Sequence, residues 1–228
     1  MSPRYNHPAR PFWPIAALLA AACASSGGTQ TAPAATPAPA PNAQTAELEA
    51  IYRARIDSAR MRFSPADVHF FTGMIGHHAQ ALVMAALIPT HGASPALRTL
   101  GARITNAQQD EIALMQRWLR DRNQPVPTYE IDGINLTIHG ADHAMHMPGM
   151  LTQDQLERLD QARGQEFDRL FLTYMIQHHQ GAVTMVDDLF ATDGAAQSDA
   201  VFKLASDIQV DQRTELARMR QMLETSQP

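Results

Sequence analysis

The chain has almost no cysteine, since Cys23 is the single one among its 228 residues. One cysteine can form no disulfide within the chain and cannot build a metal site from several thiolates. Histidine and methionine are plentiful by contrast, with 10 and 12 copies. Imidazole and thioether groups are therefore the side chains left for binding a soft metal ion.

Positive charge is also scarce, with 18 Lys and Arg residues against 23 Asp and Glu residues. Two of the basic residues, Arg4 and Arg10, lie in a predicted export signal, and removing them leaves 16 against 23. A nucleic-acid-binding protein needs a concentrated basic face, and this balance argues against one. The sequence also lacks a glycine-rich phosphate-binding loop. We therefore expect no nucleic-acid partner.

The N-terminus has the features of an export signal. Arg4 and Arg10 precede an apolar run over residues 12–22, which is too short to span a bilayer. Cys23 follows directly and resembles the lipid-attachment site of bacterial lipoproteins. Ala24 comes next, and by resemblance to lipoprotein sorting rules this favours the outer membrane. The alternative is simple cleavage near Ala22, which would leave a soluble periplasmic or secreted protein.

The signal peptide is thus predicted at 1–22, and the predicted membrane contact is a lipid on Cys23 alone. Residues 23–46 are rich in Ala, Pro, Thr, Ser and Gly and are predicted to form a disordered linker. A folded domain is expected over 47–228. Its first element is a helix to about Met61, because Leu48, Ile51, Tyr52 and Ile56 form an apolar stripe.

A paired-histidine motif occurs twice, 101 residues apart. Residues 74–84 read Met-Ile-Gly-His-His-Ala-Gln-Ala-Leu-Val-Met, and residues 175–185 read Met-Ile-Gln-His-His-Gln-Gly-Ala-Val-Thr-Met. A second block follows each motif at an offset of 104 residues. It contains the matched positions Gln108 and Gln212, Glu111 and Glu215, and Met115 and Met219. Two such copies predict two similar structural units packed together.

Both blocks have the apolar spacing of helices, and Ser-Pro pairs at 64–65 and 94–95 offer helix starts. We expect four core helices at about 65–89, 95–121, 165–191 and 199–224. Repeat one then covers about 65–121 and repeat two about 165–225, joined by a long crossover over 122–164. A capping box at Thr152–Gln155 opens a short helix to about Arg163. The expected fold is an all-α four-helix bundle made of two repeated hairpins, with no strand.

The repeats place two imidazoles and two thioethers on overlapping faces of each histidine helix. Packing the hairpins about a pseudo-two-fold axis would bring these groups together, and such ligands suit copper, with zinc possible as an alternative. The candidate metal ligands are His77, His78, His178, His179, Met74, Met84, Met175 and Met185. A structural role as buried, hydrogen-bonded histidines and apolar methionines is the alternative.

Four acidic residues are candidate partners of these histidines. Glu111 and Glu215 lie on the apolar stripes of the partner helices, where accepting a histidine N–H would orient the ring. Asp67 and Asp168 lie on the histidine helices and could serve the same role. They could instead be acids at helix N-termini, stabilised by the helix dipole.

The crossover holds a further cluster of soft ligands within residues 139–150. A flexible loop of this kind could wrap a soft cation, or it could be a hinge whose methionines cover one end of the bundle. The candidate loop ligands are His139, His143, Met145, His146, Met147 and Met150.

Two motifs carry a resemblance to a known family. They are the Met-Pro-Gly-Met run at 147–150 and the segment 164–185, Gly-x-x-Phe-Asp-x-x-Phe-Leu-x-x-Met-Ile-x-His-His-x-Gly-Ala-x-x-Met. Over residues 47–225 the chain resembles the bacterial domain-of-unknown-function family 305. The resemblance implies a place in the ferritin-like superfamily, and copper handling, because some exported members bind copper and contribute to copper resistance. Asp187 and Asp188 depart from the family pattern.

The sequence therefore predicts a cell-envelope protein that binds a metal ion. Copper is the favoured metal, and the expected role is copper sequestration or resistance. One alternative is an envelope-tethered structural or interaction bundle without metal. A di-metal oxidoreductase is less favoured, because such sites use Glu-x-x-His motifs and this chain has none. We accordingly expect no enzymatic activity, and the sequence identifies no protein partner.

Overall fold

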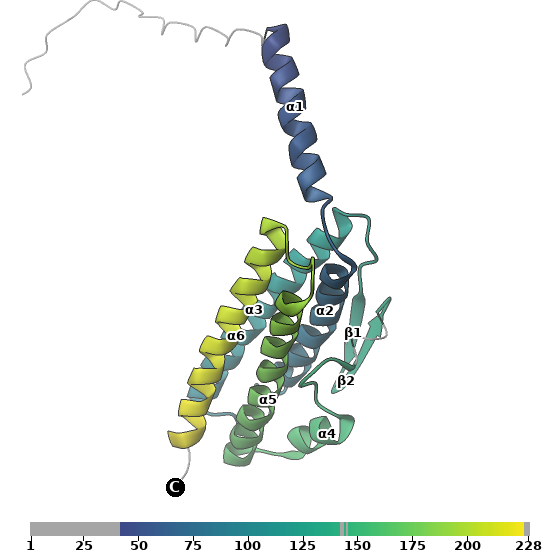
Figure 1. The fold of residues 1–228 in the computed structure, drawn as a ribbon. Coiled ribbons are helices and arrows are strands. Elements are labelled where there is room, and N and C mark those ends of the chain that lie inside the picture. The colour runs from purple at the N-terminus through teal and green to yellow at the C-terminus, as the bar shows by residue number, and fades with distance from the viewer. Residues whose placement is uncertain (1–41, 142–143, 145, 226–228) are drawn as a thin grey trace, which may run out of the picture. The chain divides into compact units, whose positions relative to one another are not determined.

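The computed structural model describes residues 42–141, 144 and 146–225. Helices α2 and α3 form one hairpin and α5 and α6 form the other, and α2 contacts α5 (Figure 1). The prediction of an all-α bundle is thereby confirmed, while membership of the ferritin-like superfamily stays a prediction. The elements in chain order are α1 Ala43–Arg60, α2 Pro65–Ala86, α3 Pro95–Arg120, β1 Thr128–Asp132, β2 Asn135–His139, α4 Gln153–Gln161, α5 Gly164–Ala191 and α6 Asp199–Thr225.

The helix starts follow from local sequence. Ser64 and Asp67 form a reciprocal capping box at the start of α2, and the Ser94 hydroxyl caps α3. Thr152 opens α4 with the predicted capping box, and the Ser198 hydroxyl accepts a backbone N–H at the start of α6. Each cap satisfies a backbone donor that the first helical turn leaves without a partner.

Two aspartates link the hairpins to each other. Asp67 Oδ1 on α2 accepts the backbone N–H of Ala196, which precedes α6, at 2.7 Å. Asp168 on α5 accepts the backbone N–H of Ser94, which precedes α3, at 3.2 Å. The two links are related by the internal repeat. Each joins the histidine helix of one hairpin to the residues just before the second helix of the other hairpin. These carboxylates therefore stabilise the fold.

Replacing Asp67 with Ala should lower the free energy of unfolding by about 3 kcal/mol, because orphaning a buried N–H costs about 1–3 kcal/mol and two are affected. The two donors are the backbone N–H groups of Ser64 and Ala196. Urea denaturation would measure the change. Asp168→Ala is the matched control with a smaller expected loss, because Asp168 is only half-buried. Equal losses in the two variants would contradict this explanation.

The crossover contains a β-hairpin that the sequence analysis did not predict. Strands β1 and β2 pair antiparallel, with Asp132 opposite Asn135, so the turn has two residues. Gly133 takes the first turn position with a φ of 59°, a conformation that suits glycine in such hairpins. Five-residue strands are short, and their alternation was too brief to compete with helix in the prediction.

Helix α1 begins at Ala43, so the last residues of the predicted linker are helical. Its apolar stripe is exposed to solvent, with Tyr52 at 66% and Leu48 at 62%. No helix among the described residues is long and apolar enough to cross a membrane. The predicted signal peptide, Cys23 and most of the linker lie outside the described residues.

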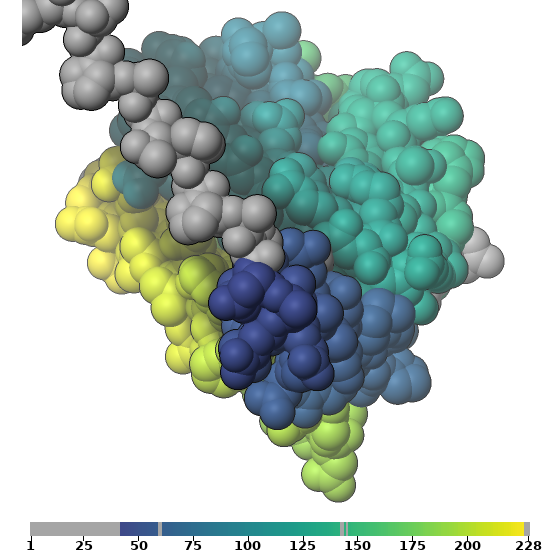
Figure 2. Space-filling model, turned by 90° about the horizontal axis from the view of Figure 1, so that it is seen from above, coloured from purple at the N-terminus to yellow at the C-terminus, as the bar shows by residue number. Residues whose placement is uncertain are grey.

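The crossover packs against the face formed by α2 and α5. Its hairpin and α4 lie on the side of the bundle opposite α6 (Figures 1 and 2). Close contact depends on Gly181 of α5, because a Cβ at this position would clash with the carbonyl oxygen of Pro148. Gln80 of α2 holds the same segment by exchanging two hydrogen bonds with the Leu151 backbone. The segment 147–151 is thus fixed over the paired histidines.

Candidate metal centre

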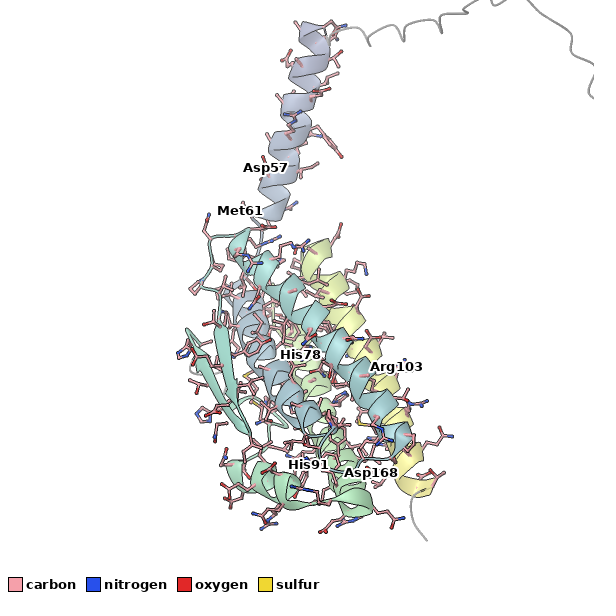
Figure 3. The ribbon with its side chains drawn as sticks, turned by 180° about the vertical axis from the view of Figure 1, so that it is seen from behind. Asp57, Met61, His78, His91, Arg103 and Asp168 are labelled. Atoms are coloured by element: carbon pink, nitrogen blue, oxygen red, sulfur yellow. The ribbon has the colours of Figure 1, made fainter. Side chains whose placement is uncertain are left out.

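All four motif histidines are fully buried, with 0% exposure. Figure 3 places His78 inside the bundle, whereas His91 and Asp168 lie at the end that α4 occupies. The rings of His77 and His178 meet across the α2–α5 interface, with their centroids 3.8 Å apart. Within each pair the ring centroids are 6.4 Å and 6.2 Å apart. The repeat axis therefore brings the first histidine of each pair together.

The second histidine of each pair is held by a glutamate from the partner helix of its own hairpin. His78 Nε2 lies 2.6 Å from Glu111 Oε2, and His179 Nε2 lies 2.7 Å from Glu215 Oε2. An ionised carboxylate only accepts hydrogen bonds, so with such a partner each Nε2 carries the proton. In a neutral ring held in this way the lone pair is on Nδ1. Each glutamate thus contacts a motif histidine of its own hairpin, and its role in orienting a metal ligand stays a prediction.

His77 has the same tautomer for a different reason. Its Nε2 lies 3.0 Å from the Pro148 carbonyl oxygen, which can only accept. Nε2 therefore donates, and Nδ1 holds the lone pair. The crossover segment thus does for His77 what the glutamates do for His78 and His179.

The remaining imidazole nitrogens have no hydrogen-bond partner in the described structure. They are Nδ1 of all four histidines, together with Nε2 of His178. A buried polar atom without a partner costs about 1–3 kcal/mol. Five such atoms on four matched residues are too many to be incidental, because buried polar groups are nearly always satisfied. Each of the four rings can offer one of these nitrogens to a ligand in the core, because a neutral imidazole has a single lone pair.

The two central rings are neutral. Burial, and to a smaller extent the neighbouring His78, lower the pKa of His77 from 6.5 to about 3. Burial, and after it the nearby histidines, lower the pKa of His178 well below its ordinary value. The His77 backbone acts in the opposite direction, because its interaction with the ring favours the charged form. A neutral imidazole keeps the lone pair that a metal ion needs.

The four flanking methionines are buried and divide between two apolar clusters. Met74 and Met185 belong to the cluster around Phe71 and Trp118, which lies towards the start of α2. Met84 and Met175 belong to the cluster around Phe167, at the other end. Because α2 and α5 run antiparallel, the histidine layer lies between one thioether pair and the other. The structure thus places sulfur on both sides of the imidazoles.

Within the described part of the chain, no three side chains of His, Cys, Asp or Glu converge in a group that could hold a metal ion. A metal ion in this core would therefore be bound by one or two imidazoles, with thioethers as the other available ligands. Zinc sites in proteins use four ligands from imidazole, thiolate and carboxylate, whereas thioether selects copper. The donor set fits copper better than zinc.

The described candidate ligands of the crossover lie in two places. His139 ends β2, is about half-exposed and lies 3.7 Å from Glu130. His146, Met147 and Met150 line one pocket together with Gln80, and Met147 also reaches α2. His143 and Met145 lie outside the described residues. Three of the four described members thus share one pocket, and His139 lies apart from them.

Asp67 and Asp168 require a correction to the sequence analysis. Their carboxylates accept backbone hydrogen bonds at helix starts and none from a described histidine. They are therefore structural residues, the second of the two roles considered for them. Asp187, part of the departure from the family pattern, binds Gln209 and Arg213 on α6.

Sequence reasoning missed two buried amides. Gln108 and Gln212 are 1% and 2% exposed and lie one turn before Glu111 and Glu215. Both amide atoms of Gln108 and the amide oxygen of Gln212 lack partners. Their matched positions in the repeat, next to the glutamates, were the available signal. They extend the polar layer of the core along α3 and α6.

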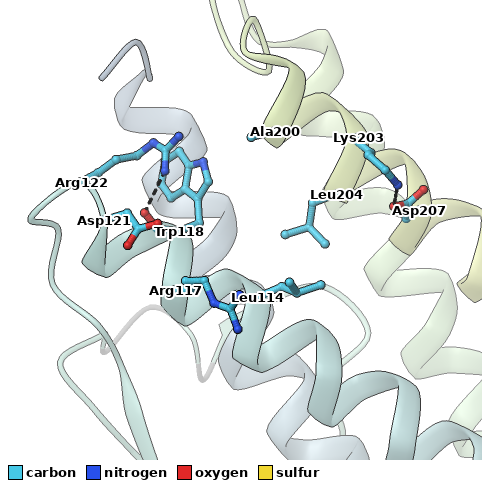
Figure 4. Close-up of a pocket in the computed structure, with 9 residues that line it drawn as sticks. All are labelled: Leu114, Arg117, Trp118, Asp121, Arg122, Ala200, Lys203, Leu204 and Asp207. Carbon is cyan, nitrogen blue, oxygen red and sulfur yellow. Dashed lines mark hydrogen bonds and ion pairs between the residues drawn. The ribbon is translucent and has the colours of Figure 1, made fainter. Parts of the chain in front are cut away.

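A separate pocket between α3 and α6 does not belong to this centre. It is lined by Trp118, whose ring is stacked by the Arg122 guanidinium at 4.3 Å, and by further apolar and charged groups (Figure 4). Its lining contains no histidine or methionine, so it offers no soft ligand. The residues that line it are Leu114, Arg117, Trp118, Asp121, Arg122, Ala200, Lys203, Leu204 and Asp207.

The geometry defines a two-hairpin helical bundle with a buried layer of paired histidines. The chain belongs to the family described as Domain of unknown function (DUF305), whose model matches residues 67–223. The comparison with functionally curated proteins gave no match.

Solved structures with the same fold include a DUF305 fragment from Deinococcus radiodurans, at 29% identity and a TM-score of 0.59. That match covers 72% of this chain and 98% of the fragment. A DUF305 protein from Streptomyces coelicolor, at 23% identity and a TM-score of 0.60, covers 71% and 93% and shows the fold alone. CopM in its Cu(I)-bound form is 28% identical with a TM-score of 0.52, covering 70% and 96%. CopM has also been solved with Cu(II) and with silver.

Proposed function

We propose that this protein is an exported copper-binding protein that sequesters copper through the buried histidine layer. The observation that carries the proposal is the set of five buried imidazole nitrogens without hydrogen-bond partners. Three of the four rings are fixed by Nε2 hydrogen bonds, so that Nδ1 is the atom available for a metal ion. Fixing the tautomer through the other ring nitrogen is how proteins orient metal-binding histidines.

Copper is favoured by the ligands and by the relatives. In the core, buried methionines lie on both sides of the histidine layer. Their thioethers bind Cu(I) in preference to harder ions. CopM, with the same fold at 28% identity, has been solved bound to Cu(I), Cu(II) and silver. The sequence features of the export signal and of Cys23 support a place in the periplasm, as an outer-membrane lipoprotein.

We further propose that the protein is not an enzyme. Glu111 and Glu215 are each directed at a histidine of their own hairpin, and the chain has no Glu-x-x-His motif. The competing function is a purely structural bundle. It is supported by the same three Nε2 hydrogen bonds, but it leaves the five unpartnered nitrogens unexplained.

The sharpest test is His178→Leu, because within the described residues neither ring nitrogen of His178 makes a hydrogen bond of normal geometry and the His77 backbone is the one polar group near the ring that affects its pKa apart from the other histidines. The variant should fold and bind Cu(I) more weakly by at least the ~10–100-fold that follows loss of a residue supporting a metal ligand. Competitive titration against a Cu(I) chelator would measure the affinity.

His91→Gln is the matched control, since His91 is also buried but donates to the Asp160 backbone outside the histidine layer. Its copper affinity should match that of the unmodified protein. No Cu(I) binding by the unmodified protein, or equal binding by His178→Leu, would favour the structural bundle.

A further inference from the structure

A second set of soft ligands meets in a pocket on the α2–α5 face, at the end away from α4. Helix α2 contributes His69, the crossover contributes Met147, and helix α5 contributes Met185 and Asp188. His69 was not among the residues that the sequence suggested as ligands. One imidazole and two thioethers from three segments of the chain thus line one cavity.

The position of the Met147 sulfur is defined by a glycine. A Cβ on Gly73 would lie 3.0 Å from Met147 Sδ and 2.7 Å from its Cε, so the thioether rests directly on the α2 backbone. Gly73 is one helical turn beyond His69, so the two side chains share a face of α2. The sulfur of Met147 therefore lies on the His69 side of the helix, next to the crossover.

The internal repeat shows that this polarity is specific to one end of the bundle. The position equivalent to His69 in repeat two is Leu170, and the position equivalent to Asp188 in repeat one is Leu87. Both leucines pack with the apolar cluster that α4 covers. The end away from α4 carries an imidazole and a carboxylate where the end beside α4 carries leucines.

We propose that His69, Met147 and Met185 form a second binding site, for a soft monovalent cation such as Cu(I) or Ag(I). Two thioethers and one imidazole are neutral ligands that suit such an ion. Asp188 lines the same pocket and supplies a negative charge that offsets the charge of the cation. This charge gives a function to Asp188, one of the two residues that depart from the family pattern.

The site goes beyond the proposed core function, although it adjoins the core. Met185 belongs to the buried cluster next to the histidine layer. Pro148, which lines the pocket, accepts the hydrogen bond from His77. Transfer of a cation from this site to the histidine layer would rest on the proposed function, whereas binding at the site does not.

The test is a titration of the full chain with Ag(I), observed by NMR of [13C-methyl]methionine and of the histidine ring nitrogens. Met147→Leu and Met185→Leu assign the two methyl signals with little change of volume. The Met147 and Met185 signals should move together. Met147→Leu should remove one equivalent of bound Ag(I) and abolish that movement of the Met185 signal, and His69→Leu should weaken both.

Met150→Leu is the matched control, because Met150 is the other methionine of the same four-residue motif. Met150 does not line the pocket of His69 but the neighbouring one with Gln80 and His146, which Met147 also borders. It should leave both signals unchanged. An unaltered Met185 response in Met147→Leu, or the same loss in Met150→Leu, would overturn the second site.

The two proposals fail separately. Movement of the Met147 and Met185 signals without any response of the core histidines supports the second site and counts against the core. Movement of the core histidine signals alone supports the core and overturns the second site. Absence of any Ag(I) binding overturns the second site as well.

Discussion

Replacing Glu111 and Glu215 together with Gln is expected to lower the affinity for copper by about 10²–10⁴-fold, since each partner of a ligating histidine contributes about 10–100-fold. Glutamine keeps the size of the side chain and can still accept the Nε2–H. It loses the negative charge that strengthens this bond and makes Nδ1 a better donor to the metal. The two carboxylates lie on separate hairpins, so their effects should combine.

Competitive chelator titration of the double variant and of each single variant would measure this effect. The matched control replaces Glu157 and Glu224 with Gln, which removes the same charge from exposed positions. A loss of affinity in the control equal to that in the double variant would assign the effect to net charge. The proposed support of His78 and His179 would then be wrong.

Without metal, the protein should lose folding stability between pH 6.5 and pH 5, about 1.6 kcal/mol from His77 and a further amount from His178. The pKa of His77 falls from 6.5 to about 3 on folding, and that of His178 falls well below 6.5. Well above pH 6.5, neither the folded nor the unfolded protein binds a proton at these rings. As the pH falls below 6.5, the unfolded chain is protonated and the folded one is not, so stability decreases.

Urea denaturation at a series of pH values, in the presence of a chelator, would test this dependence. His178→Leu removes one of the two groups and should roughly halve the loss of stability. His139→Gln changes a half-exposed ring on the β-hairpin and should leave the loss unchanged. An unaltered pH dependence in His178→Leu would show that this ring is not kept neutral by the fold.

The predictions from sequence succeeded where local patterns suffice. Spacing of apolar residues, Ser-Pro helix starts and the duplicated block predicted helices whose observed ends differ by a few residues. The same spacing placed Glu111 and Glu215 on buried stripes, and both are found there. Such features depend on neighbours within a turn or two along the chain, and a sequence shows them directly.

The failures involve contacts between distant segments. Asp67 carried the pattern of a helix-start acid, but its bond to Ala196 crosses between hairpins and has no local sign. The Pro148 carbonyl oxygen, which fixes the tautomer of His77, is a backbone atom that no residue pattern can indicate. The β-hairpin was missed because two five-residue strands give too little alternation.

For this chain, sequence alone determined the helices, their pairing into two repeats and the soft character of the available ligands, because helical periodicity and composition are local properties. Tertiary structure alone decided that the ring of His77 meets that of His178, and that His69 shares a pocket with Met147 and Met185. Such meetings depend on the axial register of one hairpin against the other and on where the crossover lies. Packing over the whole core sets both, and residues far apart in the chain contribute to it.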